Sequence, residues 1–311
     1  MLDYDVVIIG GGPAGLTAGL YLSRGKQRTI LLEKESFGGQ IKNVECIENY
    51  PGFADGVSGA HLASEMVTQA IKFGLQLEQA EVVGIELYSS SRWVGCAGGA
   101  GHMATAVVIA GGSRHKRLGV PGEEGLQGKG VINCALCEGA QFADRVVAVC
   151  GGGDTGVTEA LYLTKLASRV ILIEAESSLT ATAVLQERAS VNPKLDIRCG
   201  AKVEAIVGDS QVEAIELLEV GSGQRRTLKV DGVLVGIGFE PNTSYLEGIV
   251  PLDSQGRILV NDRMETQVPG VFAAGDIRQD SARQVVTAVG DGATAALSAE
   301  RFLGQQESAR T

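Results

Sequence analysis

The run DVVIIGGGPAG, residues 5–15, decides the fold of this chain. Its apolar part, Val6–Ile9, has the length and composition of a buried strand. The glycines that come next, Gly10, Gly12 and Gly15, have the spacing G-x-G-x-x-G, which lets the backbone turn tightly and approach a phosphate at the start of a helix. The run therefore predicts a strand, a tight turn and a helix that begins at a phosphate site.

The next residues complete a β-α-β unit. An apolar helix pattern follows over residues 16–22, and a second strand over Thr29–Leu32 ends at Glu33. Glu33 lies 23 positions after Gly10 (33 − 10 = 23), which is close to the spacing at which a carboxylate binds the ribose hydroxyls of a dinucleotide. A fingerprint in this full context predicts dinucleotide binding, whereas an isolated glycine-rich turn would be consistent with a purely structural turn.

A second unit of the same form occupies the middle of the chain. Val146–Cys150 is typical of a buried strand, GGGDTG at residues 151–156 repeats the fingerprint, and a strand over Val170–Ile173 ends at Glu174. Glu174 lies 23 positions after Gly151 (174 − 151 = 23). The residues predicted to form this second dinucleotide site are Gly151, Gly153, Asp154, Thr155, Gly156 and Glu174.

A C-x-x-C pair, Cys134 and Cys137, precedes the second fingerprint, with Glu138 directly behind it. Two thiols at this spacing can close a disulfide, and a helix N-terminus after them would lower a thiol pKa. Half of a zinc site is one alternative, but the sequence has no second Cys/His pair at similar spacing, and we expect no metal. Chance spacing among six cysteines is another. Two dinucleotide sites beside the pair predict electron transfer between cofactors and on to a disulfide.

Composition limits the remaining possibilities. The chain has 311 residues, enough for two domains, and a net charge of −10, which argues against nucleic acid as a partner. No apolar run reaches the length of about eighteen residues that a membrane span needs. The first strand begins almost at Met1, which leaves no room for a signal peptide. We therefore expect a cytoplasmic protein, in which a C-x-x-C pair is catalytic or metal-binding rather than structural.

Two further sets of residues are expected in the hydrophobic core. One set recurs at helical spacing and comprises Leu62, Met66, Ala70 and Phe73. The other consists of the cysteines outside the C-x-x-C pair, interpreted as small buried hydrophobes: Cys46, Cys96, Cys150 and Cys199.

Seven motifs are spread along nearly the whole chain. They are GGGPAG at 10–15, GGQ at 38–40, ENYPG at 48–52, CALCEG at 134–139, GGGDTG at 151–156, VFAAGD at 271–276, and Arg283-Gln284 before a Gly/Ala-rich helix to Phe302. Together they resemble the low-molecular-weight thioredoxin reductase family. The resemblance implies an α/β fold with two Rossmann-like dinucleotide-binding domains, the second inserted in the first. It places an FAD-binding domain at 1–113 and 241–311, and an inserted domain with the C-x-x-C pair at 114–240.

The resemblance also implies the roles of individual residues. Cys137 would lie nearer the flavin, in contact with its ring, while Cys134 would attack the partner's disulfide and Glu138 would protonate the departing thiolate. The partner would be thioredoxin or a thioredoxin-like protein, and the chain would form a homodimer. The residues implied to hold FAD are Gly10, Gly12, Pro13, Ala14, Gly15, Glu33, Lys34, Gly39, Gln40, Asn49, Gly275, Asp276, Arg283, Gln284 and Val285.

The sequence departs from the family pattern at the electron donor. Family members that use NADPH carry a basic cluster after the second strand of the inserted domain, whereas residues 174–182 here contain no Lys or Arg. Glu174 would repel a 2'-phosphate and suits free ribose hydroxyls, so NADPH is disfavoured. NADH and a second FAD remain open for this site. Reduced ferredoxin is a third donor, but no aromatic residue follows Phe302 and the acidic chain would repel an acidic carrier.

The predicted function is therefore that of a flavin-dependent disulfide oxidoreductase. The alternative from another class is a flavin-binding redox sensor or docking protein with little turnover.

Overall fold

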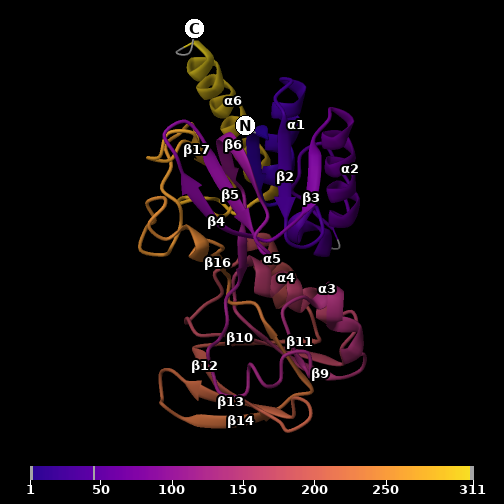
Figure 1. Ribbon diagram of the computed structural model, residues 1–311. Helices are drawn as coiled ribbons and strands as arrows, with labels where there is room; N and C mark the ends of the chain where they lie inside the picture. Colours follow the sequence, from indigo (N-terminus) through magenta and orange to yellow (C-terminus); the bar gives the residue numbers. More distant parts are fainter. Residues whose placement is uncertain (1–2, 45, 309–311) are drawn as a thin grey trace. The chain divides into compact units, whose positions relative to one another are not determined.

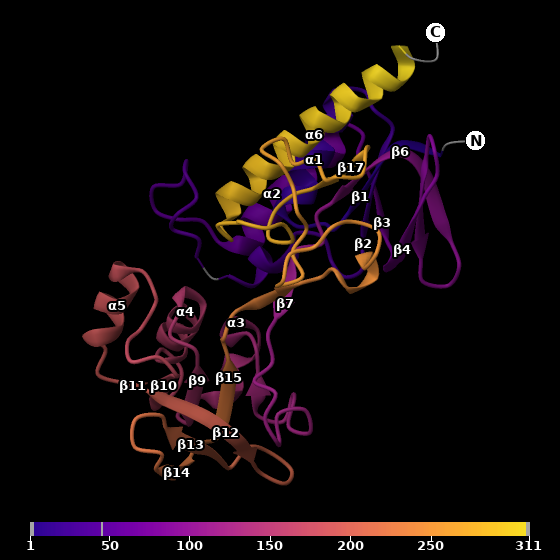
Figure 2. The same ribbon diagram turned by 90° about the vertical axis from the view of Figure 1, so that its left-hand side faces the viewer.

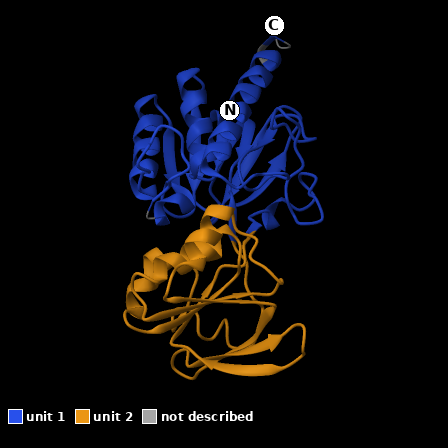
Figure 3. Ribbon diagram, turned by 180° about the vertical axis from the view of Figure 1, so that it is seen from behind, with its two compact units in different colours: residues 1–114, 240–311 blue, residues 115–239 orange. Residues whose placement is uncertain are grey.

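The computed structural model describes residues 3–44 and 46–308, and in this range the chain forms two compact units (Figure 3). Unit 1 comprises residues 1–114 and 240–311, and unit 2 comprises residues 115–239. The domain boundaries expected from the sequence, 113/114 and 240/241, each differ from these by one residue. One unit is thus inserted in the sequence of the other.

Unit 1 is built on a mixed sheet with the strand order β3-β2-β1-β6-β5-β4, and β17 pairs with β6 (Figure 1). The strands β1, β2, β3, β6 and β17 run parallel to one another, while β4 and β5 form antiparallel pairs. The bounds are β1 Tyr4–Ile9, β2 Thr29–Glu33, β3 Gln76–Gln79, β4 Val82–Leu87, β5 Arg92–Cys96, β6 Gly101–Ile109 and β17 Val271–Ala273.

Helices cover this sheet, and α1 and α6 lie side by side in both views (Figures 1 and 2). Strand β1 is buried on both faces: Val6 and Ile8 belong to the core cluster that includes α1 and α6, and Val7 and Ile9 belong to a second cluster. This alternation follows from the two-residue period of a strand. The helical bounds are α1 Pro13–Arg24, η1 Gly39–Asn43, α2 Gly59–Lys72, η3 Ser244–Leu246 and α6 Val285–Ser308.

Unit 2 repeats the parallel arrangement on a smaller scale. Its parallel sheet has the order β11-β10-β9-β15-β8, and an antiparallel sheet has the order β12-β13-β14. The strand bounds are β8 Val131–Ile132, β9 Val146–Cys150, β10 Arg169–Glu174, β11 Leu195–Cys199, β12 Ala201–Val207, β13 Ala214–Glu219, β14 Arg225–Lys229 and β15 Gly232–Val235. The helical bounds are α3 Ala135–Glu138, η2 Gly139–Phe142, α4 Asp154–Leu163 and α5 Ala183–Ser190.

A short two-stranded sheet lies where the chain passes between the units. Strand β7, Ser113–His115, pairs with β16, Phe239–Pro241. Arg114 and Glu240 also form an ion pair of 2.7 Å between Nε and Oε1. Among the helices of residues 3–44 and 46–308, none is long and apolar enough to cross a membrane.

Three residues expected in the core lie at the surface instead. Phe73 is 42% exposed because it follows the last residue of α2, so it leaves the buried face, and the Arg24 guanidinium covers its ring at 5.5 Å. Cys46 is exposed in the loop after η1, and Cys199 is exposed at the end of the edge strand β11. The expectation was wrong for these three because residue type and spacing do not show which positions a neighbouring element covers: Cys199 ends an edge strand, whereas the buried Cys96 and Cys150 end strands with a neighbour on each side.

The other residues of both sets are covered, as expected. Leu62 and Ala70 are buried and Met66 is partly buried, and Cys96 and Cys150 are buried. Burial raises the pKa of the Cys150 thiol to about 12.

Candidate active site

The first fingerprint forms a tight glycine turn between β1 and α1. Gly10 has φ of +105°, and a Cβ there would lie 2.3 Å from the Ala110 carbonyl oxygen. A Cβ on Gly15 would lie 1.9 Å from the Gly10 carbonyl oxygen. Helix α1 begins at Pro13, and Gly12 caps it without a side-chain hydrogen bond. Helix α1 therefore begins directly after a turn whose glycines carry no side chain, and the backbone N–H groups at a helix start favour an anion.

Glu33 is held in position by the backbone. Its carboxylate accepts a hydrogen bond from the Gly11 N–H at 2.6 Å and another from the Glu35 N–H at 2.9 Å. A carboxylate has about four lone-pair sites, so acceptor capacity remains for ribose hydroxyls. The neighbouring Lys34 forms an exposed ion pair with Glu81 at 2.7 Å.

The segment after β2 closes on the fingerprint. Gly39 has φ of +62°, and a Cβ there would lie 2.8 Å from the Gly12 Cα atom. The Gln40 side-chain amide donates to the Ser113 carbonyl oxygen. Glycine is therefore required at Gly39 for the two glycine segments to approach so closely.

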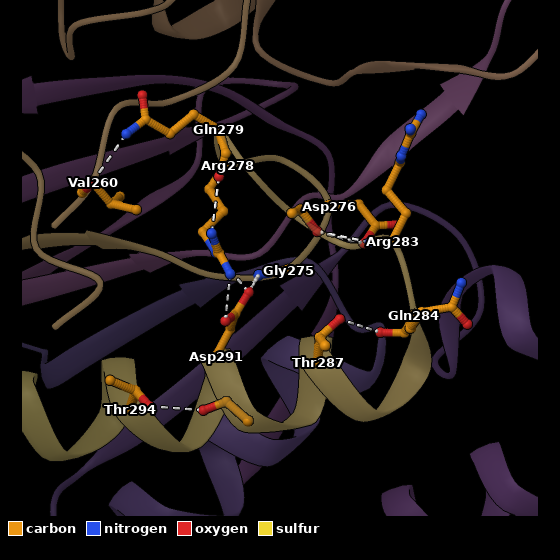
Figure 4. A network of polar contacts seen from close by, with 12 residues as sticks. Val260, Gly275, Asp276, Arg278, Gln279, Arg283, Gln284, Thr287, Asp291 and Thr294 are labelled. Carbon is orange, nitrogen blue, oxygen red and sulfur yellow. Dashed lines mark hydrogen bonds and ion pairs between the residues drawn. The ribbon is translucent and has the colours of Figure 1, made fainter. Parts of the chain in front are cut away.

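The turn after β17, in the C-terminal part of unit 1, packs against the start of α1. Gly275 has φ of +81°, and its Cβ would lie 3.0 Å from the Ala14 Cβ atom, so the turn after β17 sits on the first turn of α1. Ser281 donates to the Asp276 carboxylate at 3.3 Å (Figure 4). Burial raises the pKa of Asp276.

Gln284, the residue before α6, links a distant loop to this region: its side-chain oxygen accepts from the Asn49 amide at 2.9 Å. Arg283 has φ of +53°, and its N–H donates to Ser281 at 3.2 Å. Val285 is the first residue of α6. A glycine turn at the start of a helix, a positioned carboxylate and a closely packed turn fit a dinucleotide such as FAD in unit 1.

The second fingerprint has the same backbone geometry. A Cβ on Gly151 would lie 2.3 Å from the Gly236 carbonyl oxygen, and a Cβ on Gly156 would lie 1.9 Å from the Gly151 carbonyl oxygen. The Glu174 carboxylate accepts from the N–H groups of Gly152 and Glu176, the latter at 2.9 Å. Unit 2 therefore also presents a glycine turn with an acid fixed beside it.

The segment after β10 bonds to its fingerprint as the counterpart in unit 1 does, where the Gly38 N–H donates to the Gly11 carbonyl oxygen at 2.8 Å, and the difference between the units lies in the side chains. Thr180 and Ala181 donate their N–H groups to the Gly152 carbonyl oxygen at 2.9 and 3.0 Å. Asp154, the first residue of α4, accepts the Thr182 N–H at 2.6 Å. Thr155, also predicted for this site, is half-buried in the first turn of α4. The first turn of α4 therefore carries an acid that binds the following segment, whereas the first turn of α1 has no acid.

The two cysteines of the C-x-x-C pair are joined by a disulfide, with a Cα–Cα distance of 5.4 Å. Cys134 caps α3, and its Sγ accepts the Cys137 N–H at 3.1 Å. Cys137 is exposed, whereas Cys134 is half-buried. Among the residues that the structure describes, no three His, Cys, Asp or Glu side chains gather as a metal site.

A carboxylate that no sequence motif includes supports this turn. Glu159, on α4, accepts the Ala135 N–H at 2.5 Å, and burial raises its pKa. The contact joins residues 24 positions apart, so no spacing rule points to it. Glu138, predicted as the acid, lies half-buried at the end of α3.

Two glycine-turn nucleotide modules and a disulfide in a helical turn define a class of enzyme that moves electrons between nucleotide cofactors and a disulfide. The model of the pyridine nucleotide-disulphide oxidoreductase family matches residues 4–292. The thioredoxin reductase of Bacillus subtilis is 41% identical over 311 residues, which cover 99% of this chain and 98% of that protein.

Two solved structures have the same fold. The thioredoxin reductase of Lactococcus lactis aligns with a TM-score of 0.95 at 36% identity, covering 97% of this chain and 100% of that one. The thioredoxin reductase of T. acidophilum aligns with a TM-score of 0.92 at 32% identity, covering 97% and 99%. The chain belongs to the pyridine nucleotide-disulphide oxidoreductase family and is a thioredoxin reductase-like flavin disulfide oxidoreductase. The expected α/β fold with Rossmann-like domains and the expected FAD cofactor are confirmed.

Proposed function

We propose that this flavoenzyme reduces the disulfide of thioredoxin or of a thioredoxin-like protein through Cys134 and Cys137, with an electron donor other than NADPH. The observation that carries the proposal is the disulfide in the α3 turn, with Cys137 exposed to an incoming protein. The similarity to thioredoxin reductases, at about 40% identity over the whole chain, supports thioredoxin as the partner.

We assign FAD to unit 1. The N–H groups at the start of α1 would bind its pyrophosphate, and Glu33 would accept from its ribose hydroxyls. Gly39 and Gly275 would keep side chains away from it, and Asp276 would bind its ribityl or ring region. When bound, the flavin supplies a carrier that accepts and donates two electrons.

Disulfide exchange follows from the geometry of the reduced pair. A Cys137 thiolate attacks one partner sulfur, a bond forms between the two proteins, and the partner's own S–S bond breaks. The partner thiolate that leaves takes a proton, for which we propose Glu138. The Cys134 thiolate then attacks the Cys137 sulfur, restores the disulfide and expels the partner's second sulfur as a thiolate, which takes a proton from water, so that the partner leaves as a dithiol. Two electrons have passed to the partner.

The order of attack in this proposal is the reverse of the order that the family resemblance implies. The exposed Cys137 is the sulfur that a partner reaches, and the Cys137 N–H that bonds to the Cys134 sulfur stabilises a thiolate at Cys134. That thiolate is then available for the second step.

For the donor, we propose that unit 2 binds a nucleotide without a 2'-phosphate. Glu174, fixed by the N–H groups of Gly152 and Glu176, would accept from free ribose hydroxyls and repel a phosphate. NADH and a second FAD both meet this condition, and reduced ferredoxin stays the third donor. A homodimer and a cytoplasmic location are further proposals, which rest on the family resemblance and on cysteine usage.

Single cysteine variants test the proposal. The thioredoxin used for trapping keeps only its attacking cysteine, which is activated as a mixed disulfide with a small thiol. Reduced Cys134→Ser should form a covalent complex with this thioredoxin through Cys137. Cys137→Ser should not trap it, and Cys199→Ser, an exposed cysteine outside the pair, should turn over as the wild type does.

Trapping by Cys137→Ser alone would restore the order implied by the resemblance. Full turnover by Cys134→Ser would remove the pair from the reaction. Absence of steady-state disulfide reduction with NADH, NADPH and reduced ferredoxin would favour the redox sensor or docking protein.

A further inference from the structure

A buried ion pair lies behind the turn that carries Asp276 (Figure 4). Arg278 donates from Nε to Asp291 Oδ2 at 2.7 Å and from Nη2 to Asp291 Oδ1 at 2.8 Å. The two side chains are only 15% and 9% exposed. Such a two-bond fork fixes direction as well as distance.

The same carboxylate also holds the turn itself. Asp291 Oδ2 accepts the Gly275 N–H at 3.1 Å. Gly292, the next residue of α6, lies so close to α1 that a Cβ there would be 2.2 Å from the Ala14 carbonyl oxygen. Asp291 therefore joins helix α6 to the turn after β17, and the next residue, Gly292, packs this part of α6 on the first turn of α1.

Arg278 secures the other side of Asp276. Its N–H donates to the Gly275 carbonyl oxygen at 3.3 Å, and its Nη1 donates to the Gln279 carbonyl oxygen at 2.9 Å. Asp276 thus lies between two residues that are both bonded to Asp291. The backbone of Asp276 has little freedom while the ion pair is intact.

We propose that Arg278 and Asp291 are positioning residues for the flavin, because their ion pair fixes the Gly275–Asp276 turn on α1 and sets where Asp276 meets bound FAD. The inference rests on the assignment of FAD to unit 1. Removal of one partner leaves the other as an uncompensated buried charge, which moves to find water and releases the turn.

The test measures flavin binding separately from stability. In Asp291→Asn, the dissociation constant of FAD from the apoprotein should rise by about tenfold or more, and the visible circular dichroism of the bound flavin should change. Asp5→Asn is the control, because Asp5 forms an Asp–Arg ion pair with Arg28, more exposed than that of Asp291, at the opposite end of β1. The control should leave both the flavin affinity and the spectrum as in the wild type.

A purely structural role gives a different result. Asp291→Asn would then lower the melting temperature of the apoprotein while the FAD affinity and the spectrum stay unchanged, and this result would overturn the inference.

Arg278→Lys covers the case in which Asp291→Asn does not fold. Lysine keeps the charge and loses the fork, so this variant should fold, bind FAD about threefold more weakly and show the altered flavin spectrum. Unchanged affinity and spectrum would overturn the inference. The FAD content and the thioredoxin reduction of the wild type are measured in parallel. Absence of either contradicts the proposed function. If both are present and the variants behave as the wild type, only the inference fails.

Discussion

The two nucleotide modules of this chain, one in each unit, have the same backbone geometry at the glycine fingerprint and differ in the residues beside it. In each, the first glycine packs against a carbonyl oxygen at the end of a neighbouring strand. The acid at the end of the second strand accepts hydrogen bonds from two backbone N–H groups. In unit 1 helix α1 begins with Pro13, whereas in unit 2 helix α4 begins with Asp154. The segment that follows the second strand and bonds to the fingerprint contains Gly38-Gly39 in unit 1 and Thr180-Ala181 in unit 2.

This difference lies outside the glycines of the fingerprint. Gly39 meets Gly12 with no side chain between them, while the Thr180 hydroxyl lies 3.7 Å from the place of a Cβ on Gly153. The Asp154 carboxylate already takes part of the favourable field at the start of α4. We expect these residues, together with Glu174, to influence which nucleotide unit 2 binds.

The largest effect is expected when a methyl group added to the fingerprint forces its backbone apart. In Gly15→Ala and Gly156→Ala the new Cβ would lie 1.9 Å from a backbone carbonyl. A clash with backbone costs about 3 kcal/mol, or about two orders of magnitude in affinity. Gly15→Ala should lose FAD on gel filtration, and Gly156→Ala should keep the FAD of unit 1. Equal FAD loss in both variants would contradict the separation of the two sites.

A smaller effect is expected from the acid of unit 2. Glu174→Gln keeps an acceptor for the Gly152 N–H and removes the charge, which should improve binding of 2'-phospho-ADP relative to ADP by about tenfold. ADP is a suitable probe because NADH and FAD share it. Calorimetric titration of the FAD-loaded protein measures the ratio. Glu33→Gln, the matched change in unit 1, should leave it unchanged, and a shift in both variants would refute the assignment.

In each unit, the exposed cysteine outside the redox pair should react with an alkylating reagent and the buried one should not. Unit 1 has the exposed Cys46 and the buried Cys96, and unit 2 has the exposed Cys199 and the buried Cys150. With the redox pair oxidised, iodoacetamide at pH 8 should label two thiols per chain, since two of the free cysteines are exposed. Peptide mass spectrometry identifies them. Rapid labelling of Cys150 would contradict its burial and its pKa of about 12.

The smallest effect concerns Glu159 under the redox turn. Burial raises its pKa in the folded state above the ordinary value of 4.5, so the native protein holds this proton to higher pH than the unfolded chain does. Its contribution to the free energy of unfolding is complete below that value and is lost as pH rises through the folded pKa. Glu159→Gln should remove this slope in urea denaturation between pH 4.5 and 7.5. A slope equal to that of the wild type would assign it to other groups.

Local patterns in the sequence were enough to predict the nucleotide modules. Strands β1 and β2, the start of α1 and the place of Glu33 come from a spacing that physical chemistry ties to one backbone geometry. The bonds from Glu159 to Ala135 and from Asp291 to Gly275 were not predicted, because they join distant residues that no pattern relates.

Exposure could not be predicted from residue type and spacing, because it depends on which elements the tertiary structure places beside each residue: Cys150 ends a strand with a neighbour on each side, and Cys199 ends an edge strand. Cys150 belongs to β9 and is buried, as expected. Cys199 ends an edge strand, and Phe73 follows the end of a helix, so both are exposed despite apolar character. Strand order and exact element ends depend on tertiary packing that a single sequence does not encode locally.

The central claim is that unit 1 carries FAD while unit 2 excludes a 2'-phosphate. The most direct test is to count FAD per chain after denaturation and to titrate the native protein anaerobically with NADH and with NADPH. We predict at least one FAD per chain that NADPH does not bleach. Bleaching by NADH would make NADH the donor, and two FAD per chain, or indifference to both nucleotides, would place the donor elsewhere. Rapid bleaching by NADPH would contradict the account.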